Sequence, residues 1–308
     1  MIKINKISIA TLAAAGLVFC STSAFADGAP FVDQNPIVVA NNEVGIAATG
    51  TLMNYQEHIT PGPSDTESGW MPGFRVSASG MNSDSGLLPL VYLAVAYQYN
   101  NHSVTYHGAL LNPGHTPLTD PSASVTQSAS VKLGKGFNIT NDLMITPYVT
   151  YNWYHWSRSS GINHEIYSQN SVGVGFMTQY SPMQDLVLGV DAAWLYGIGS
   201  GMHKPEASVA SLGGPYVEYA PPGQNYHIKN RATVKVSLDA DYTIAHSWHI
   251  IGGVQYMHTN FGQSPGVSSY LVDTNTGAAT PLPDRYAFYE PDSSTNLFTL
   301  SLGIAYAF

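Results

Sequence analysis

Apolar and polar residues alternate along the last ten residues of the chain, TLSLGIAYAF, from 299 to 308. Small or polar residues separate five apolar ones at every second position. A strand turns successive side chains to opposite faces, so this pattern predicts a strand with one apolar face. Free chain ends usually fray, and a strand ending on an aromatic ring must therefore be held by neighbouring strands. The apolar residues of this strand are Leu300, Leu302, Ile304, Tyr306 and Phe308.

The same period-two pattern recurs in segments of roughly ten residues or more, separated by turn-forming residues, as in membrane β-barrels. In the clearest segment, Val234, Val236 and Leu238 share one face. Lys235 and Asp239 share the other. The predicted strands before the last one are 43–56, 70–80, 87–99, 124–137, 143–156, 166–180, 186–198, 228–242 and 248–260.

The connections between these segments alternate between short and long. Bacterial outer-membrane barrels have short periplasmic turns and long extracellular loops, and an even strand number leaves both termini on the turn side. The short connections are 81–86, 138–142, 181–185 and 243–247, and the long ones lie near 57–69, 100–123, 157–165, 199–227 and 261–295. We therefore predict an all-β fold over 43–308, a closed antiparallel transmembrane β-barrel of about ten strands. Pro147 cannot donate a ladder hydrogen bond, which predicts a bulge in the fifth strand.

Composition supports a membrane barrel over a soluble one. The chain is 10% charged, where a soluble domain is typically about 25% charged. The alternative is a secreted sandwich or lipocalin-like barrel, whose strands also alternate. Tryptophan and tyrosine near strand ends instead suggest interfacial aromatic girdles; they are Trp70, Trp153, Trp194, Trp248 and Tyr306.

The N-terminus has the features of a secretory signal peptide. Lys3 and Lys6 precede the apolar run Ile7–Cys20, and Ala24-Phe25-Ala26 predicts cleavage after residue 26. A transmembrane helix would need a longer run, and a lipoprotein site at Cys20 would follow a bulky Phe19. We predict a signal peptide over 1–26 and a periplasmic N-terminal segment over 27–42, which is either a free stretch or a plug.

Charge and cysteine content narrow the partners and cofactors further. Cys20 is the only cysteine, so the mature chain can have no disulfide and no cysteine-based zinc site. Removing Lys3 and Lys6 lowers the basic count from 11 to 9, and with 20 acidic residues the mature net charge is 9 − 20 = −11. This charge disfavours nucleic acid as a partner.

The ending LFTLSLGIAYAF resembles the C-terminal signature of Gram-negative outer-membrane β-barrel proteins. The resemblance implies recognition by the barrel-assembly machinery and insertion among outer-membrane lipid and lipopolysaccharide. The size also resembles the omptin proteases, which use paired aspartates and an Asp-His pair at the outer rim. The Asp-x-Asp of this chain, Asp239-Ala240-Asp241, falls at the periplasmic end of its strand, so the omptin activity does not carry over.

Six charged residues are out of phase with the apolar positions of their strands and are predicted to face the lumen: Arg75, Lys132, Asp191, Arg231, Lys235 and Asp239. They could form a charged constriction that selects solutes, or a network of ion pairs that fills a narrow barrel. A charge facing lipid at mid-depth costs about 2–4 kcal/mol for Arg or Lys, which favours the inward orientation.

The remaining candidate chemistry is sparse. Nine of the 11 histidines lie in or beside the predicted outer loops, without close ligand spacing. No nucleophile elbow, phosphate loop or nucleotide fingerprint is present. We expect no catalytic set, no metal site and no cofactor. A small passive channel is the leading hypothesis; the alternatives are a non-conducting structural or adhesin-like surface protein acting through its loops, and, third, a barrel-embedded hydrolase.

Overall fold

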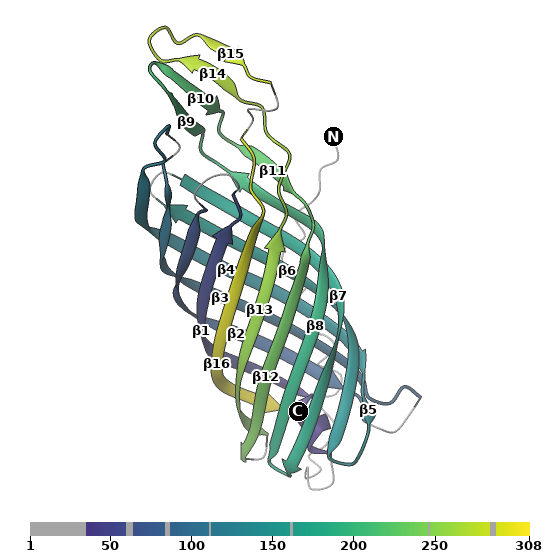
Figure 1. Ribbon diagram of the computed structural model, residues 1–308. Helices are drawn as coiled ribbons and strands as arrows, with labels where there is room; N and C mark the ends of the chain where they lie inside the picture. Colours follow the sequence, from purple (N-terminus) through teal and green to yellow (C-terminus); the bar gives the residue numbers. More distant parts are fainter. Residues whose placement is uncertain are drawn as a thin grey trace.

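Ten long strands form a closed antiparallel barrel in the computed structural model, which describes residues 35–59, 64–83, 87–110, 112–160, 163–245, 247–283 and 288–308. The predicted signal peptide at 1–26 and residues 27–34 lie outside the described residues. Neighbouring strands pair along the chain, and the last strand closes the barrel on the first (Figure 1). The barrel strands are β1 Glu43–Glu57, β2 Thr66–Met81, β3 Val91–Ala109, β4 Pro117–Lys135, β6 Leu143–Ser160, β7 Asn163–Met183, β8 Leu186–Lys204, β12 Ala232–Ala245, β13 Trp248–Phe261 and β16 Ser293–Ala307.

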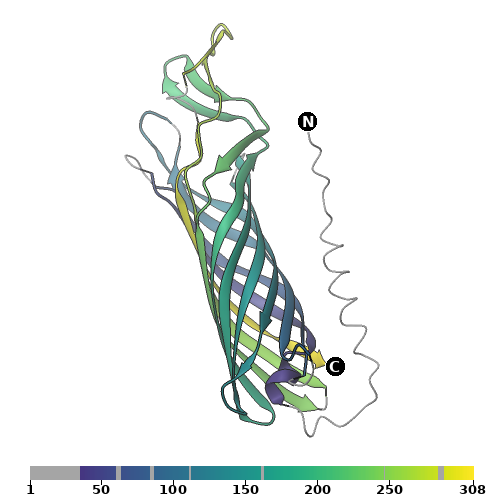
Figure 2. The same ribbon diagram turned by 90° about the vertical axis from the view of Figure 1, so that its right-hand side faces the viewer.

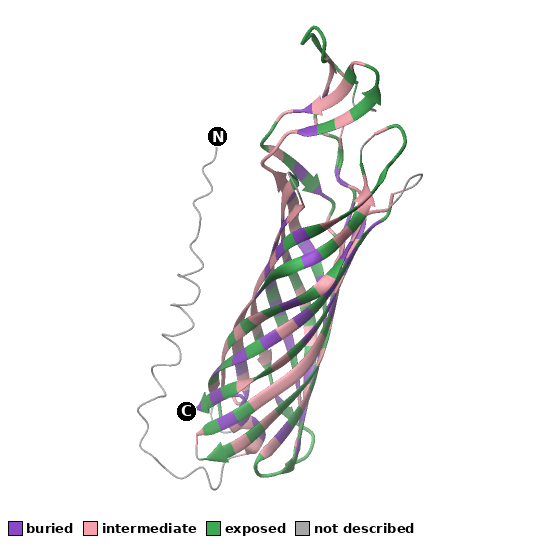
Figure 3. Cartoon of the chain, turned by 90° about the vertical axis from the view of Figure 1, so that its left-hand side faces the viewer, coloured by how far each residue is buried: buried purple, intermediate pink, exposed green. Residues whose placement is uncertain are grey.

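The closing strand β16 has the two faces that its sequence predicts. Leu302 is 66% exposed on the outside, while Ala305 and Ala307 are buried in the interior. β16 pairs with β1 on one side and β13 on the other, and Ile304 lies opposite both Ile46 and Ile250. Buried and exposed residues alternate in the same way along the other strands (Figure 3). The predicted closed ten-stranded barrel is therefore confirmed.

A band of exposed apolar side chains surrounds the outside of the barrel, as expected for a surface that contacts lipid. Exposed aromatic residues border it: Trp70, Trp194 and Tyr256 on one side, and Tyr242, Trp248 and Tyr306 on the other. We call the end with the chain termini and short turns the turn end, and the opposite end the loop end. Among the described residues, no helix is long and apolar enough to cross a bilayer.

The strands continue past the apolar band at the loop end. Outward residues there are polar and exposed, as at Asn54, Gln56 and Asn101. β3 extends to Ala109 and β4 begins at Pro117, so the connection predicted at 100–123 is much shorter. The predicted strand ends were wrong here because apolar alternation stops where lipid contact stops, although the hydrogen-bonded ladder goes on. We call this part of the barrel the outer extension.

The bulge predicted at Pro147 is wrong. Pro147 pairs with Phe176 within a continuous β6–β7 register. On its other side, pairing with β4 ends at Gly134 opposite Tyr148 and resumes where Phe137 of β5 (Phe137–Asn138) meets Ile145. The missing N–H of proline is therefore accommodated by a break in the neighbouring strand and requires no extra residue.

Two connections at the loop end fold together into a second sheet outside the barrel. β9 (Ser208–Gly213) and β10 (Tyr216–Ala220) come from one connection, and β14 (Tyr270–Asp273) and β15 (Ala279–Pro281) from the other. Their order is β15-β14-β10-β9, and β9 is an edge strand. This loop-end sheet stands above the barrel in Figure 1. A further strand, β11 (Gln224–Ile228), pairs with β8.

A short helix, α2 (Pro36–Ala40), lies at the turn end of the barrel (Figure 2). The side chain of Asn35 caps it by accepting a hydrogen bond from the Ile37 amide at 2.9 Å. Ile37 is fully buried against interior residues of the barrel. The side-chain amides of Asn41 and Gln179 exchange hydrogen bonds of 2.7 and 3.1 Å. Ile37, Ala40 and Asn41 therefore pack inside the turn end of the lumen.

Candidate functional site in the barrel interior

Side chains from opposite walls meet across the lumen in its loop-end half. Trp156 and Tyr167 have no exposed surface, and their ring centroids are 5.0 Å apart. Tyr55 lies 4.8 Å from Trp156, and Phe261 lies 5.7 Å from Tyr167. These side chains are buried, so solvent does not reach them at this level. We call this cluster, together with Arg158 and the glutamates around it, the outer plug. Its apolar and aromatic members are Met53, Tyr55, Met71, Val104, Tyr154, Trp156, Tyr167, Met202, Tyr226, Ile228, Met257, Phe261 and Leu297.

Arg158 is the central charge of the outer plug. Its guanidinium lies 3.0 Å from Glu57, 3.4 Å from Glu67 and 2.6 Å from Glu165. Three rings also surround it, with centroids at 4.8 to 5.4 Å: Tyr55, Trp156 and Tyr167. A buried charge is tolerated when ion pairs and hydrogen bonds replace its hydration, and aromatic faces add cation–π attraction.

Carboxylates outnumber cations around Arg158, in the outer extension beyond the apolar band. Four of them, Glu57, Glu67, Glu165 and Glu290, are opposed by Arg158 and by Lys204, whose Nζ lies 3.5 Å from Glu165. Burial raises the pKa of Glu57 to about 7 and raises that of Glu290 strongly. Burial alone would also raise the pKa of Glu165, but attraction to Arg158 and Lys204 outweighs it and lowers that pKa to about 2. The cluster therefore combines ionised and protonated carboxyl groups at neutral pH.

Glu290 joins the cluster from the connection that precedes β16. Tyr167 donates its hydroxyl hydrogen to Glu290 at 2.5 Å, and its oxygen lies 3.0 Å from Glu165. The Glu290 amide donates to the Ser264 hydroxyl at 2.8 Å. These bonds attach the long connection between β13 and β16 to the interior of the barrel.

A cavity of about 230 Å³, lined by charged, polar and apolar residues, extends from the middle of the barrel toward the turn end. Lys132 and Tyr148 both contact the carboxylate of Asp191, and Lys235 donates to the side-chain oxygen of Asn152 at 2.6 Å. The structure places five of the six charged residues predicted from the sequence on the wall of this cavity: Arg75, Lys132, Asp191, Lys235 and Asp239.

Arg231, the sixth, lies elsewhere. Its guanidinium is 3.3 Å from Asp292 at the loop end, and 49% of its side chain is exposed. β12 begins at Ala232, so the strand that was expected to orient Arg231 toward the lumen starts one residue later.

The outer plug is the part of the interior that the sequence analysis missed. The alternation of apolar residues ends before Glu57, Arg158 and Glu165, and it therefore predicts that they lie in outer loops. The sequence nevertheless indicates that Arg158 faces inward, because Tyr154, Trp156 and Arg158 continue the alternation of the inward residues of β6. Extending that phase past the aromatic girdle would have identified Arg158.

The catalytic arrangement of omptins has no counterpart at the loop end among the described residues. The one Asp-His ion pair found in the described ranges joins Asp241 to His249 at the turn end. The outer plug contains Glu, Arg and Tyr; its buried charged residues are Glu57, Glu67, Arg158 and Glu290.

Comparison with solved structures places this architecture among Gram-negative outer-membrane β-barrels. The outer membrane protease OmpT from Escherichia coli has a TM-score of 0.50 at 10% identity, covering 86% of this chain and 95% of that one. The transport unit of the autotransporter AIDA-I from Escherichia coli (TM-score 0.41, 12% identity, 96% and 97% covered) and the Neisserial surface protein A (0.33, 10%, 86% and 97%) also match. No protein-family model and no curated protein sequence matches the chain. The likeness to OmpT is one of fold.

Proposed function

We propose that this protein is a non-conducting outer-membrane barrel that presents its loop-end sheet to a partner outside the cell. The observation that carries the proposal is the outer plug, whose fully buried side chains come from strands all around the barrel. The α2 helix packs inside the opposite end of the lumen. Passive passage would require both obstructions to move, so we favour this hypothesis over the small channel that the sequence suggested first.

The loop-end sheet supports a role in surface interaction. Two connections far apart in the chain form one sheet, although a lipid-spanning barrel has no need of it. Val209, Leu212 and Tyr216 on its β9–β10 hairpin are 45 to 53% exposed. The edge strand β9 contains no charge and no proline, the features that usually protect an edge from pairing. An extended peptide segment of another protein could therefore pair its backbone with β9.

The proposal includes the route to this location. The signal peptide over 1–26 would direct export and be removed, and the closing strand would be recognised by the assembly machinery. The apolar band would then contact outer-membrane lipid, with the turn end in the periplasm and the loop-end sheet outside. We propose no catalytic role, because Arg158 and most of its glutamate partners are buried and engaged with one another.

Planar-bilayer recording tests the closed lumen. The folded mature protein should give no stable conductance steps, and proteoliposomes should show no solute-dependent swelling. A double variant, Trp156→Ala with Tyr167→Ala, removes two rings from the plug and serves as a positive control if it remains folded. Reproducible open steps from the wild-type protein would overturn the proposal.

A binding experiment tests the role of the loop-end sheet. Outer-membrane vesicles carrying the protein should bind to host or neighbouring cells, and Val209→Lys with Leu212→Lys should reduce that binding several-fold. The matched control is Leu88→Lys, which changes a leucine that is 64% exposed at the turn end. Equal binding by both variants and the wild type would remove the sheet from the proposed function.

A further inference from the structure

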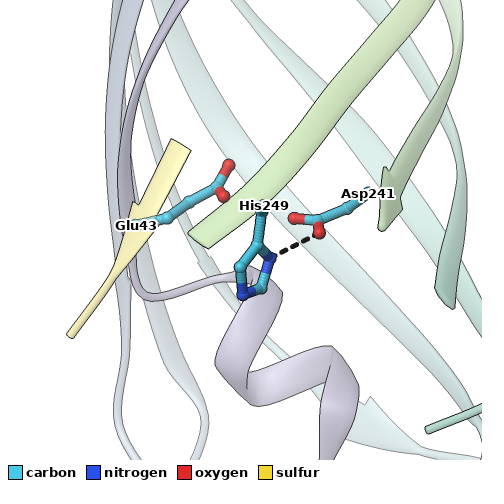
Figure 4. A group of neighbouring side chains, drawn as sticks. All are labelled: Glu43, Asp241 and His249. Atoms are coloured by element: carbon cyan, nitrogen blue, oxygen red, sulfur yellow. Dashed lines mark hydrogen bonds and ion pairs between the residues drawn. The ribbon is translucent and has the colours of Figure 1, made fainter. Parts of the chain in front are cut away.

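Three side chains with metal-binding groups meet at the turn end of the barrel. Glu43 begins β1, Asp241 lies near the end of β12, and His249 lies near the start of β13. One donor atom from each lies within 4.8 Å of the other two. Figure 4 shows the two carboxylates turned toward each other, with the imidazole beside them.

The group contains more polar atoms than it can satisfy internally. His249 is 1% exposed, and its Nδ1 lies 2.5 Å from Asp241. Its Nε2 and the Oε2 atom of Glu43 are both buried and have no hydrogen-bond partner among the described residues. Two carboxylates facing each other repel unless a proton or a cation lies between them. A donor set of this composition, with His249 buried and the carboxylates of Glu43 and Asp241 on the wall of the cavity, is therefore suited to a cation.

We propose that Glu43, Asp241 and His249 bind a divalent transition-metal ion of the zinc type. One imidazole nitrogen and two carboxylate oxygens suit Zn²⁺, which takes such ligands at about 2 Å. Mg²⁺ and Ca²⁺ prefer all-oxygen sites. Donors bound to one such ion lie at most about 4 Å apart, so binding requires a small side-chain rotation. Water would supply the fourth ligand.

The position of the site implies its role. β16 lies between β1 and β13, so the ligands come from both sides of the closing strand. The inward residues of β16 beside them are Ala305 and Ala307, both small and buried. A metal ion here would link β1 to β12 and β13 across β16, the strand that closes the barrel. It would also hold the connection between α2 and β1, because Glu43 follows Asn41 and Asn42 directly.

This inference is independent of the proposed function, and Zn²⁺ titration of the folded mature protein tests it. The protein is refolded in detergent without metal, and calorimetry with Zn²⁺ should show one ion per chain. The urea midpoint should rise with Zn²⁺, and an excess of Mg²⁺ should have no effect on either result. His249→Ala and Glu43→Gln should each weaken binding at least about tenfold, since even changes in the residues that orient metal ligands cost about 10–100-fold.

Asp239→Asn is the matched control, because Asp239 lies on the same strand as Asp241, two residues away, and lines the cavity. It should bind Zn²⁺ like the wild type. Heat-modifiable migration on gels verifies that each variant is folded, and Glu43→Gln provides the test if His249→Ala does not fold. Absence of stoichiometric binding by the wild type, or unchanged binding in both ligand variants, would overturn the proposal and leave a shared proton as the bond between the carboxylates.

Discussion

The outer plug and the central cavity are built from the same ten strands but have opposite interiors. Inward residues of β6 are Tyr154, Trp156 and Arg158 in the plug, and Tyr148 and Thr150 at the cavity. The plug is dry and contains large rings, while much of the cavity wall consists of small residues and long charged side chains. A barrel of this strand number is narrow, so the size of the inward side chains decides whether its lumen is closed.

The two regions also differ in how they hold charge. In the cavity, Lys132 and Asp191 form an ion pair beside open space. In the plug, Arg158 has three carboxylate partners and is 8% exposed. Removing one partner of a buried ion pair leaves an uncompensated charge without water, whereas a charge lining a wet cavity can be hydrated instead. The same substitution should therefore have different effects in the two regions.

The largest effect is expected for Arg158→Met. It leaves Glu57, Glu67 and Glu165 without their shared cation, and breaking such a buried cluster costs about 3–5 kcal/mol. Urea unfolding of the refolded protein, followed by tryptophan fluorescence, measures the change. Arg75→Met is the control, since Arg75 lines the cavity and is partly exposed; we expect it to cost under about 1 kcal/mol. Similar losses for both variants would contradict the contrast between a dry and a wet interior.

The stability of the folded protein should depend on pH because of the carboxyl groups in the plug. Glu57 determines whether stability rises or falls with pH. Burial raises its pKa from 4.5 to about 7 in the folded state. Between these values the unfolded chain releases a proton that the folded protein keeps, so stability falls as pH rises. The contribution of Glu57 is fully present below about pH 4.5 and is lost above about pH 7. A shift of this size corresponds to about 3–4 kcal/mol.

Glu57→Gln should therefore reduce the loss of stability between pH 5 and pH 8, as measured from urea midpoints at both values. Glu165→Gln is the matched control from the same cluster. The pKa of Glu165 is lowered to about 2, so its contribution is present above pH 4.5 and is lost only in more acidic solution. That variant should keep the wild-type slope from pH 5 to 8, and a wild-type slope in Glu57→Gln would refute the assignment.

The sequence predicted what lipid contact constrains, and it missed what only the interior constrains. Outward positions such as Leu302 and Val236 must be apolar at every second residue, so the strands within the band and the closure of β16 on β1 could be inferred. Inward positions have no such requirement for apolar residues. The contact between Glu57 and Arg158 joins residues 101 positions apart, and only the curvature of the closed barrel brings them together. Arg75 and Lys235 could be assigned to the lumen because they are out of phase with the apolar positions of their strands.

The smallest expected effect is the difference in stability between two serine-to-alanine variants of β4. Ser124 is fully buried in the plug region and accepts a hydrogen bond from the Trp156 indole at 2.7 Å. Ser130 faces the central cavity. Ser124→Ala leaves the indole N–H unsatisfied in a dry environment, which costs about 1–3 kcal/mol. Ser130→Ala should change stability by less than about 0.5 kcal/mol, because water in the cavity can replace the hydroxyl.

Both serine variants remove one hydroxyl from an inward position of β4, so strand propensity and membrane contact are the same in each. The comparison therefore isolates the environment of the side chain. Equal urea midpoints for the two variants would mean that water reaches Trp156, and the outer plug would then be permeable at that level. A larger loss for Ser124→Ala alone would place the boundary between the dry and wet interior between residues 124 and 130 of β4.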